Sequence, residues 1–296
     1  MSLSAGPVFA PCLNTARGIP SRIDVSGDRI LWCGATHCMI RTLATGECSV
    51  FSGHRAATSV ARFAPSGELA GSADAKGNVL GWLVGTQAVK FEFVYGGEVR
   101  DMAWSPDGSL LAVCGSKGVK LISTETGKSV SDDMTGNNKC VNGIAFRVSN
   151  LSSTADRAQC ASVAPPLPPR LAPHTSHTHS RSLDLQPTGA PFIVCGGEDQ
   201  KLNIYEGPPD AVKFTKSVKL KGTILWLGFD KSGERFASTG GGAVTLHDGS
   251  TGEAVGAPVK CEKSTSSMYS ACLSPDGASC LTASADKTAR VLDLAR

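Results

Sequence analysis

The sequence lacks a long apolar run, a closely spaced cysteine pair and a marked excess of charge. No apolar stretch approaches the ~20 residues that cross a bilayer, and Met1 to Gly18 hold no basic segment followed by an apolar run. Lys and Arg number 29 against 26 Asp and Glu, and a net charge of +3 gives no electrostatic footprint for nucleic acid or acidic lipid. We therefore expect a cytoplasmic protein that binds neither nucleic acid nor a membrane.

Cysteine is plentiful, but its pattern does not suggest a structural framework. The 11 cysteines form no C-x-x-C pair, and most lie inside apolar stretches. This pattern favours reduced, buried thiols over a disulfide framework or a zinc site. His174, His177 and His179 have a spacing typical of metal ligands, yet they lie in a Pro/Ser-rich segment with no rigid element to fix their geometry. We expect neither a metal nor a cofactor.

A repeated turn organises the chain. An apolar strand end is followed by Pro, Asp or Ser and then Gly, a sequence that presets a tight turn because Gly readily takes a positive φ. The copies are Val25–Gly27, Phe63–Gly67, Trp104–Gly108, Phe229–Gly233 and Leu273–Gly277. Neighbouring copies are about 40 to 44 residues apart, except between Gly108 and Gly233.

Each repeat holds about four short strands and no sustained helical period, which excludes a βαβ arrangement. Four strands per repeat of about 40 residues are typical of a β-propeller blade. The sequence therefore predicts an all-β fold, a single propeller over residues 1–296 with six recognisable blades. The last blade stops after its third strand, which leaves the ring incomplete.

The overlong interval between Gly108 and Gly233 contains a segment of different composition. Val148–Gln186 has five prolines and seven serines, with no Gly, Lys, Glu, Ile or aromatic residue. Removing it restores the repeat length, so we interpret residues 148–186 as a disordered insertion. Val-Ser can be encoded by GTGAGT and Gln by CAG, the usual ends of an intron. Our hypothesis is that the insertion is translated intron.

The repeats resemble WD repeats, whose opening Gly-His stands here at Gly53-His54. A closer resemblance covers nearly the whole chain. The stretches Ala61–Gly67, Val99–Trp104 and Tyr205–Pro209, the last followed by Val212-Lys213-Phe214, are similar to the first half of the actin-interacting protein 1 family. The Glu-Gly-Pro-Pro at residues 206–209 replaces the usual Trp-Asp and distinguishes this family from other WD proteins.

This resemblance implies a non-enzymatic protein that binds actin filaments and promotes their disassembly together with cofilin. It implies two linked seven-bladed propellers, so seven blades are expected where six are recognisable, and a second propeller half is expected that this chain does not contain. It also implies that Tyr205, Glu206 and Phe214 contact actin or cofilin. The short loop Gly115–Gly118 departs from the longer charged loop that the family usually has there.

Other interpretations of these residues stay open. Tyr205 occupies the position of the usual Trp, which equally indicates core packing, whereas Phe214 lies on an expected outer strand. His54 and His247 are expected to be structural, with His54 in a buried network with Asp74. Gly240-Gly241-Gly242 has no following Lys-Ser/Thr, and this favours a blade turn over a phosphate cradle.

No catalytic set can be identified by its spacing, and we expect no catalytic residue. Two alternative functions remain. One is a WD-repeat adaptor for another protein complex. The other is a propeller enzyme, which a cluster of polar residues converging on the central channel would favour.

Overall fold

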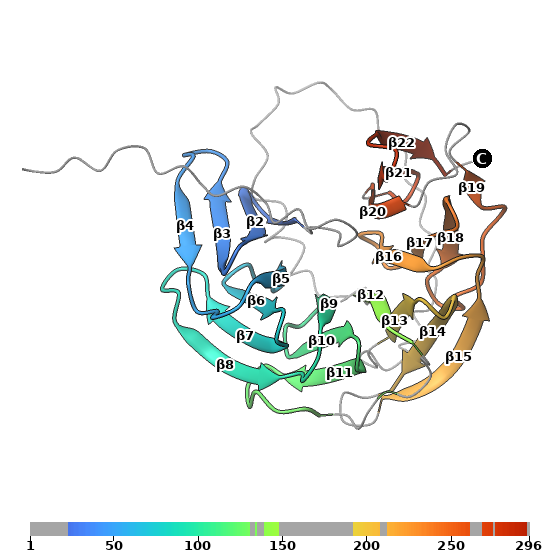
Figure 1. Ribbon diagram of the computed structural model, residues 1–296. Helices are drawn as coiled ribbons and strands as arrows, with labels where there is room; N and C mark the ends of the chain where they lie inside the picture. Colours follow the sequence, from blue (N-terminus) through green and yellow to red (C-terminus); the bar gives the residue numbers. More distant parts are fainter. Residues whose placement is uncertain are drawn as a thin grey trace, which may run out of the picture.

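The computed structural model describes residues 23–130, 134, 139–147, 192–207, 212–260, 268–274 and 276–294. These residues form strands and no helix, and the strands make six antiparallel sheets arranged about a common axis (Figure 1). The predicted all-β propeller with six blades is confirmed. Among the residues described, no helix is long and apolar enough to cross a membrane.

The blades follow one another along the chain. In order, they consist of β1 (Asp24–Ser26), β2 (Arg29–Gly34), β3 (His37–Thr42) and β4 (Cys48–Phe51); β5 (Thr58–Phe63), β6 (Leu69–Asp74), β7 (Asn78–Leu83) and β8 (Val89–Val94); β9 (Val99–Trp104), β10 (Leu110–Gly115) and β11 (Gly118–Ser123); β12 (Val141–Phe146), β13 (Phe192–Gly197), β14 (Lys201–Glu206) and β15 (Lys213–Lys219); β16 (Ile224–Phe229), β17 (Arg235–Gly240), β18 (Ala243–Asp248) and β19 (Val259–Lys260); and β20 (Met268–Leu273), β21 (Ser279–Ser284) and β22 (Ala289–Asp293).

Each blade begins with its inner strand and runs outward (Figure 1). The inner strands contact one another in sequence, from β1 and β2 through β5, β9, β12 and β16 to β20. The first and sixth blades lie apart in Figure 1. The described residues therefore form an open arc, as expected of a propeller with an incomplete ring.

The repeated glycines take the conformation that the turn requires. Gly67, Gly108, Gly233 and Gly277 have φ between 68° and 72°, and Gly27 has φ 60°. A side chain is strained in this left-handed region, whereas glycine adopts it freely. The turn pattern in the sequence is thus the hairpin between the first and second strands of five of the six blades.

The core consists of layers between neighbouring blades. Five clusters of buried apolar side chains fill the five junctions from the first blade to the sixth. Strands β6, β10 and β13 are buried along their whole length, because each is covered on both faces by adjacent blades and on both edges by strands of its own blade. This explains their small, apolar sequences.

The fourth blade joins segments on either side of the predicted insertion. Strand β12 pairs directly with β13, and the amide of Arg147 donates to the carbonyl of Phe192 at 2.9 Å. Two strands far apart in the sequence are therefore hairpin partners. The segment 148–186 lies outside the described residues, and its disorder and origin stay predictions.

Candidate functional site

The residues predicted to contact actin or cofilin lie on the two outermost strands of the fourth blade. Tyr205 on β14 pairs with Phe214 on β15, and Glu206 pairs with Lys213. The register shifts next to Tyr205, where Thr215 is an extra residue on β15. This bulge places Phe214 beside the tyrosine, and the two rings meet edge to face at 5.7 Å and 72°.

Tyr205 is part of the core. Its side chain is 1% exposed and packs in the layer between the third and fourth blades. Burial, together with the nearby Cys195, raises the pKa of the phenol, so the hydroxyl stays protonated. A partner cannot reach this ring, and its direct role is to fill the position of the usual Trp.

Phe214 and Glu206, by contrast, lie at the surface. Phe214 is 47% exposed, which confirms the exposure predicted from its place on an outer strand. Glu206 is the exposed last residue of β14. An apolar ring supported by a buried tyrosine and left half in water is the kind of side chain that anchors protein interfaces.

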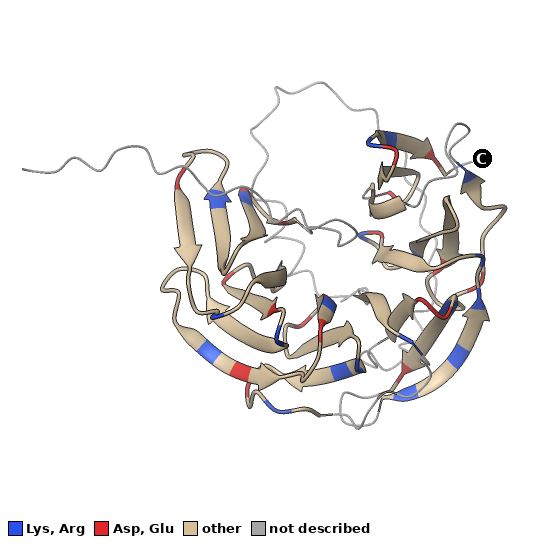
Figure 2. Ribbon diagram, in the orientation of Figure 1, with Lys and Arg blue, Asp and Glu red and all other residues tan. Residues whose placement is uncertain are grey.

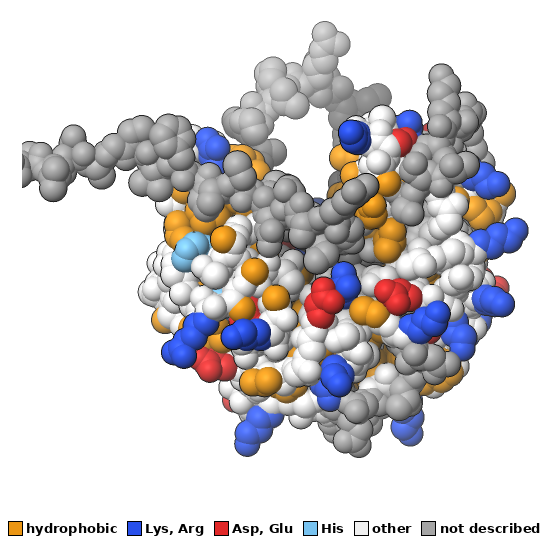
Figure 3. Space-filling model, in the orientation of Figure 1, with side chains coloured by type: hydrophobic (Ala, Val, Ile, Leu, Met, Phe, Trp, Pro, Cys, Tyr) orange, Lys and Arg blue, Asp and Glu red, His pale blue; other side chains and the backbone are white. Residues whose placement is uncertain are grey.

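The strand that carries this exposed ring is rich in lysine. Lys213, Lys216 and Lys219 recur along β15, where blue segments mark the outer edge of the blade (Figure 2). Lys216 Nζ lies 2.9 Å from Glu253 Oε1 and 3.3 Å from the carbonyl of Thr251, so it also ties the fourth blade to the fifth. On the face shown in Figure 3, most Lys and Arg side chains stand at the outer rim. Charged edge strands discourage pairing with other sheets, which is a structural reason for these lysines.

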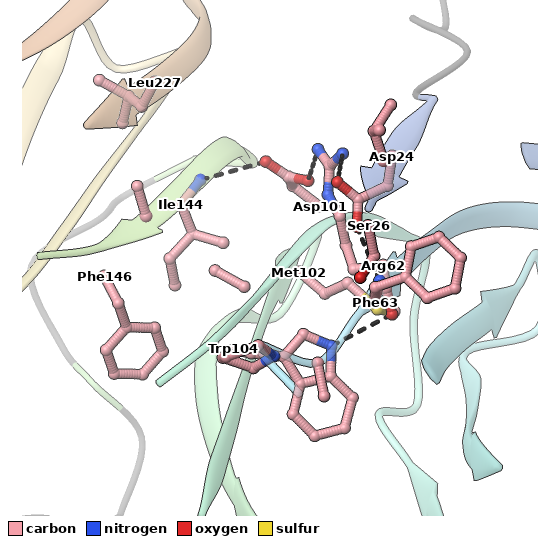
Figure 4. A pocket seen from close by; sticks show the side chains of 15 residues that line it. Asp24, Ser26, Arg62, Phe63, Asp101, Met102, Trp104, Ile144, Phe146 and Leu227 are labelled. Atoms are coloured by element: carbon pink, nitrogen blue, oxygen red, sulfur yellow. Dashed lines mark hydrogen bonds and ion pairs between the residues drawn. The ribbon is translucent and has the colours of Figure 1, made fainter. Parts of the chain in front are cut away.

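A second group of polar residues lies where the inner strands meet. An open pocket of about 360 Å³ is lined by side chains from the first five blades (Figure 4). At its wall, Arg62 Nη2 lies 3.1 Å from Asp101 Oδ1, and Nη1 lies 3.9 Å from Asp24 Oδ1. Three blades are joined by this one guanidinium.

Each carboxylate in this network also accepts a backbone amide. The amide of Phe63 donates to Asp24 at 2.7 Å, and that of Ile144 donates to Asp101 at 3.4 Å. Burial disfavours the charge on Arg62, but the two carboxylates outweigh burial and raise the pKa of the guanidinium. Polar residues thus converge on the central channel, but they are engaged with one another. This favours a structural role over acid–base catalysis.

The predicted buried histidine network is present in the second blade, with Ser72 as its hydrogen-bonding centre and Asp74 beyond hydrogen-bond distance. His54 Nε2 lies 2.6 Å from Ser72 Oγ, which accepts the indole N–H of Trp82 at 3.1 Å. His54 Nδ1 faces Asp74 Oδ2 at 3.6 Å, so we assign the ring proton to Nδ1 and let Nε2 accept from Ser72. Burial lowers the pKa of His54 despite the nearby carboxylate.

The other motifs also have structural roles. His247 is fully buried, with Nε2 2.9 Å from Ser238 Oγ and Nδ1 3.2 Å from the carbonyl of Gly252. Gly241 and Gly242 form the turn between β17 and β18 at positive φ, as predicted. The three histidines at 174–179 lie outside the described residues. In the part of the chain that the structure describes, no three His, Cys, Asp or Glu side chains gather to hold a metal.

Comparison with known families agrees with this geometry. The family described as anaphase-promoting complex subunit 4 WD40 domain matches residues 62–149, and the family of the WD domain, G-beta repeat, matches residues 258–293. Two parts of the chain are thus similar to WD-repeat domains, in agreement with the propeller fold. A WD-repeat propeller is a fold that many scaffold-type proteins share.

Individual relatives extend the similarity to almost the whole chain. WD repeat-containing protein 1 of Xenopus tropicalis is 28% identical over 97% of this chain, and that of Gallus gallus is 27% identical over 97%. Actin-interacting protein 1 of Drosophila melanogaster is 28% identical over 96%. The resemblance to the first half of the actin-interacting protein 1 family is confirmed. The chain spans only about 42% of the length of these relatives.

Proposed function

We propose that this protein binds actin filaments and promotes their disassembly together with cofilin, as a non-enzymatic scaffold of the cytoplasmic actin cytoskeleton. The observation that carries the proposal is the similarity, over 96% of the chain, to a protein named for its interaction with actin. A propeller suits this role because its rigid blades present side chains at a broad surface without needing a reactive group.

Within the proposal, Glu206 and Phe214 contact the filament or cofilin, and Tyr205 holds Phe214 in place. Phe214 supplies an apolar anchor whose orientation is restricted by the edge-to-face contact with the buried Tyr205 ring. Anchoring by a ring that is fixed before binding costs less conformational entropy. Glu206 supplies a negative charge among the lysines of β15.

Sedimentation with actin filaments, with and without cofilin, tests the function. Phe214→Ala is expected to weaken co-pelleting with cofilin-decorated filaments by about tenfold, the effect of losing a modest interface anchor. Val89→Ala is the matched control, because Val89 pairs with Trp82 on the outer strand of the second blade and is 43% exposed. Equal pelleting of wild type and Phe214→Ala would remove this surface from the proposal.

Charge is tested separately at Glu206. Glu206→Lys places two lysines opposite each other, because Glu206 pairs with Lys213. If the carboxylate contacts a basic group of the partner, binding falls and lowering the salt concentration does not restore it. Unchanged pelleting at all salt concentrations would contradict a direct contact.

A second candidate function is a WD-repeat adaptor for another complex. It is favoured by the match of residues 62–149 to a domain family named for a subunit of a large assembly. Failure of the folded wild-type protein to pellet with bare or cofilin-decorated filaments would replace the actin proposal with this one. A propeller enzyme has less support, because the polar groups at the channel are paired with one another.

A further inference from the structure

Two cysteines face each other in the first blade. Strands β2 and β3 are joined by the two-residue turn Ala35–Thr36, and Cys33 is the direct cross-strand partner of Cys38. Both side chains point into the layer between the first and second blades, where Cys33 is 7% exposed and Cys38 is fully buried.

The position in the hairpin sets the distance between them. Gly34 and His37 flank the two-residue turn and form the hydrogen-bonded pair next to it. Pairs alternate along an antiparallel ladder, so the Cys33–Cys38 pair is of the non-hydrogen-bonded kind, in which the Cα atoms are about 4.5 Å apart and the side chains are closest. Disulfides span Cα separations from about 4.4 Å, so a bond fits here without moving the strands apart.

The surroundings make the two thiols unequal. A hydrogen bond from Cys38 lowers the pKa of Cys33 against the effect of burial, with help from Thr58 and from the charge of Arg62. The same interaction and burial raise the pKa of Cys38, which also contacts Ser72. Cys33 is thus the more exposed thiol and the one more readily ionised, and Cys38 is positioned to react with it.

We propose that Cys33 and Cys38 are a redox modification site, at which a peroxide converts the two thiols into a reversible disulfide. The Cys33 thiolate attacks one oxygen of hydrogen peroxide and the O–O bond breaks, which leaves a sulfenic acid at Cys33 and a hydroxide. The hydroxide takes up the proton that Cys33 released on ionising and leaves as water. The Cys38 sulfur then attacks the Cys33 sulfur, the S–O bond breaks, and a second water leaves. Two thiols lose two electrons, and one peroxide is reduced to two waters.

The alternatives fit this pair less well. A metal site needs a third ligand, and the described residues bring no third His, Cys, Asp or Glu to the two thiols. The other buried cysteines that the structure describes have no cysteine opposite on a neighbouring strand, and Cys114, for example, faces Val119 on one side and Asp101 on the other. The disulfide would remove the Cys38 thiol from Ser72, the serine that joins His54 to Trp82. Oxidation in the first blade is thereby linked to the second blade's core.

Digestion of the oxidised chain tests the proposal directly. The folded 296-residue protein is treated with hydrogen peroxide, quenched with acid, unfolded, alkylated and cut with trypsin. Both cysteines fall in one peptide, Ile30–Arg41, while Cys114 falls in Asp101–Lys117. We expect the Ile30–Arg41 peptide to appear without alkyl groups and two hydrogen masses lighter than its reduced form, which identifies the internal disulfide. This form should appear about tenfold faster than Cys114 loses its alkylation, and dithiothreitol should reverse the change.

Variants and a second oxidant complete the test. In Cys33→Ser and Cys38→Ser the internal bond cannot form, so the remaining cysteine of the peptide becomes a sulfinic acid or stays alkylated. With oxidised glutathione the internal disulfide also forms, through a mixed disulfide at Cys33. Equal oxidation of Cys33 and Cys114, separate sulfinic acids on Cys33 and Cys38, or a mixed disulfide that never yields the internal bond would each overturn the proposal.

Discussion

The second and fifth blades place different rings at the same position. Trp82, the fifth residue of β7, stacks on Phe51 at 4.2 Å and donates to Ser72. His247, the fifth residue of β18, stacks on Phe236 at 4.7 Å and bonds Ser238. In these two blades the position therefore holds a buried flat ring that bonds a serine on the neighbouring strand, and tryptophan is only one residue that does so.

The fourth blade differs again, and in a way that reaches the surface. Tyr205 takes the ring position, with Cys195 in place of the serine. Outside it, Phe214 stands where the second blade has Val89. The inner half of a blade is thus held by packing and varies in hydrogen-bond chemistry, while the outer strand is free to carry a distinctive exposed side chain.

The largest effect is expected from removing the second blade's ring. Trp82→Ala should lower the free energy of unfolding by ~3 to 5 kcal/mol, because the indole is 1% exposed and fills the layer between two blades. Urea unfolding measures it. Trp82→Phe keeps the stacking on Phe51 and should lose less, and equal losses in both variants would mean that the hydrogen bond outweighs packing.

The same change in the fourth blade is expected to cost somewhat less. Tyr205→Ala should lower the free energy of unfolding by ~2 to 4 kcal/mol, since a smaller buried ring is lost. Tyr205→Phe removes only the hydroxyl and should cost about 1 kcal/mol. If Tyr205→Ala were as stable as wild type, the ring would not be the core element that its burial indicates.

Of the three rings compared at this position, His247 of the fifth blade adds a pH dependence. Burial lowers the pKa of His247 from 6.5 to about 4, so the unfolded chain takes up a proton that the folded chain refuses. Its contribution is fully present above pH 6.5 and falls by about 1.4 kcal/mol per pH unit as the pH drops toward the folded-state value.

Substitution by the second blade's own residue isolates this contribution. The free energy of unfolding should fall by about 2 kcal/mol less in His247→Trp than in wild type when the pH is lowered from 6.5 to 5. Urea unfolding at several pH values measures this difference. Identical slopes for the two proteins would show that His247 is not the titrating group.

The smallest effect on stability is expected at the outer strands. Phe214→Ala and Val89→Ala should each change the free energy of unfolding by less than about 0.5 kcal/mol, because both side chains are about half in water. Differential scanning calorimetry compares them. A larger loss for Phe214→Ala would show that its contact with Tyr205 stabilises the blade, and would assign any weaker actin pelleting to unfolding.

Much of the fold was predictable because it rests on local chemistry. Gly67 and Gly108 each mark a turn whose positive φ few other residues accept, and their spacing counts the blades. The exposure of Phe214 was predictable from its position on an outer strand, because one side of such a strand faces water. Tyr205 left two interpretations open, because a ring at that position serves the core and a surface equally well until its burial is known.

The remaining features depend on contacts between blades. Arg62, Asp24 and Asp101 lie about one repeat apart in the sequence, and nothing in their neighbours marks them as partners. Cys33 and Cys38 could have been paired by recognising the two-residue turn between them. Their apolar neighbours instead indicated two unrelated core residues. That interpretation correctly predicted that both are buried, but it did not predict that they are cross-strand partners.

The ion pairs of Arg62 have a consequence for how the propeller opens. The amides of Phe63 and Ile144, on the second and fourth blades, are bound to carboxylates that share this guanidinium. In an array of independent repeats, each blade would exchange its amide hydrogens at its own rate. Here the two amides are tied to one side chain, so their hydrogens should exchange with deuterium in a single cooperative event that involves the first four blades together.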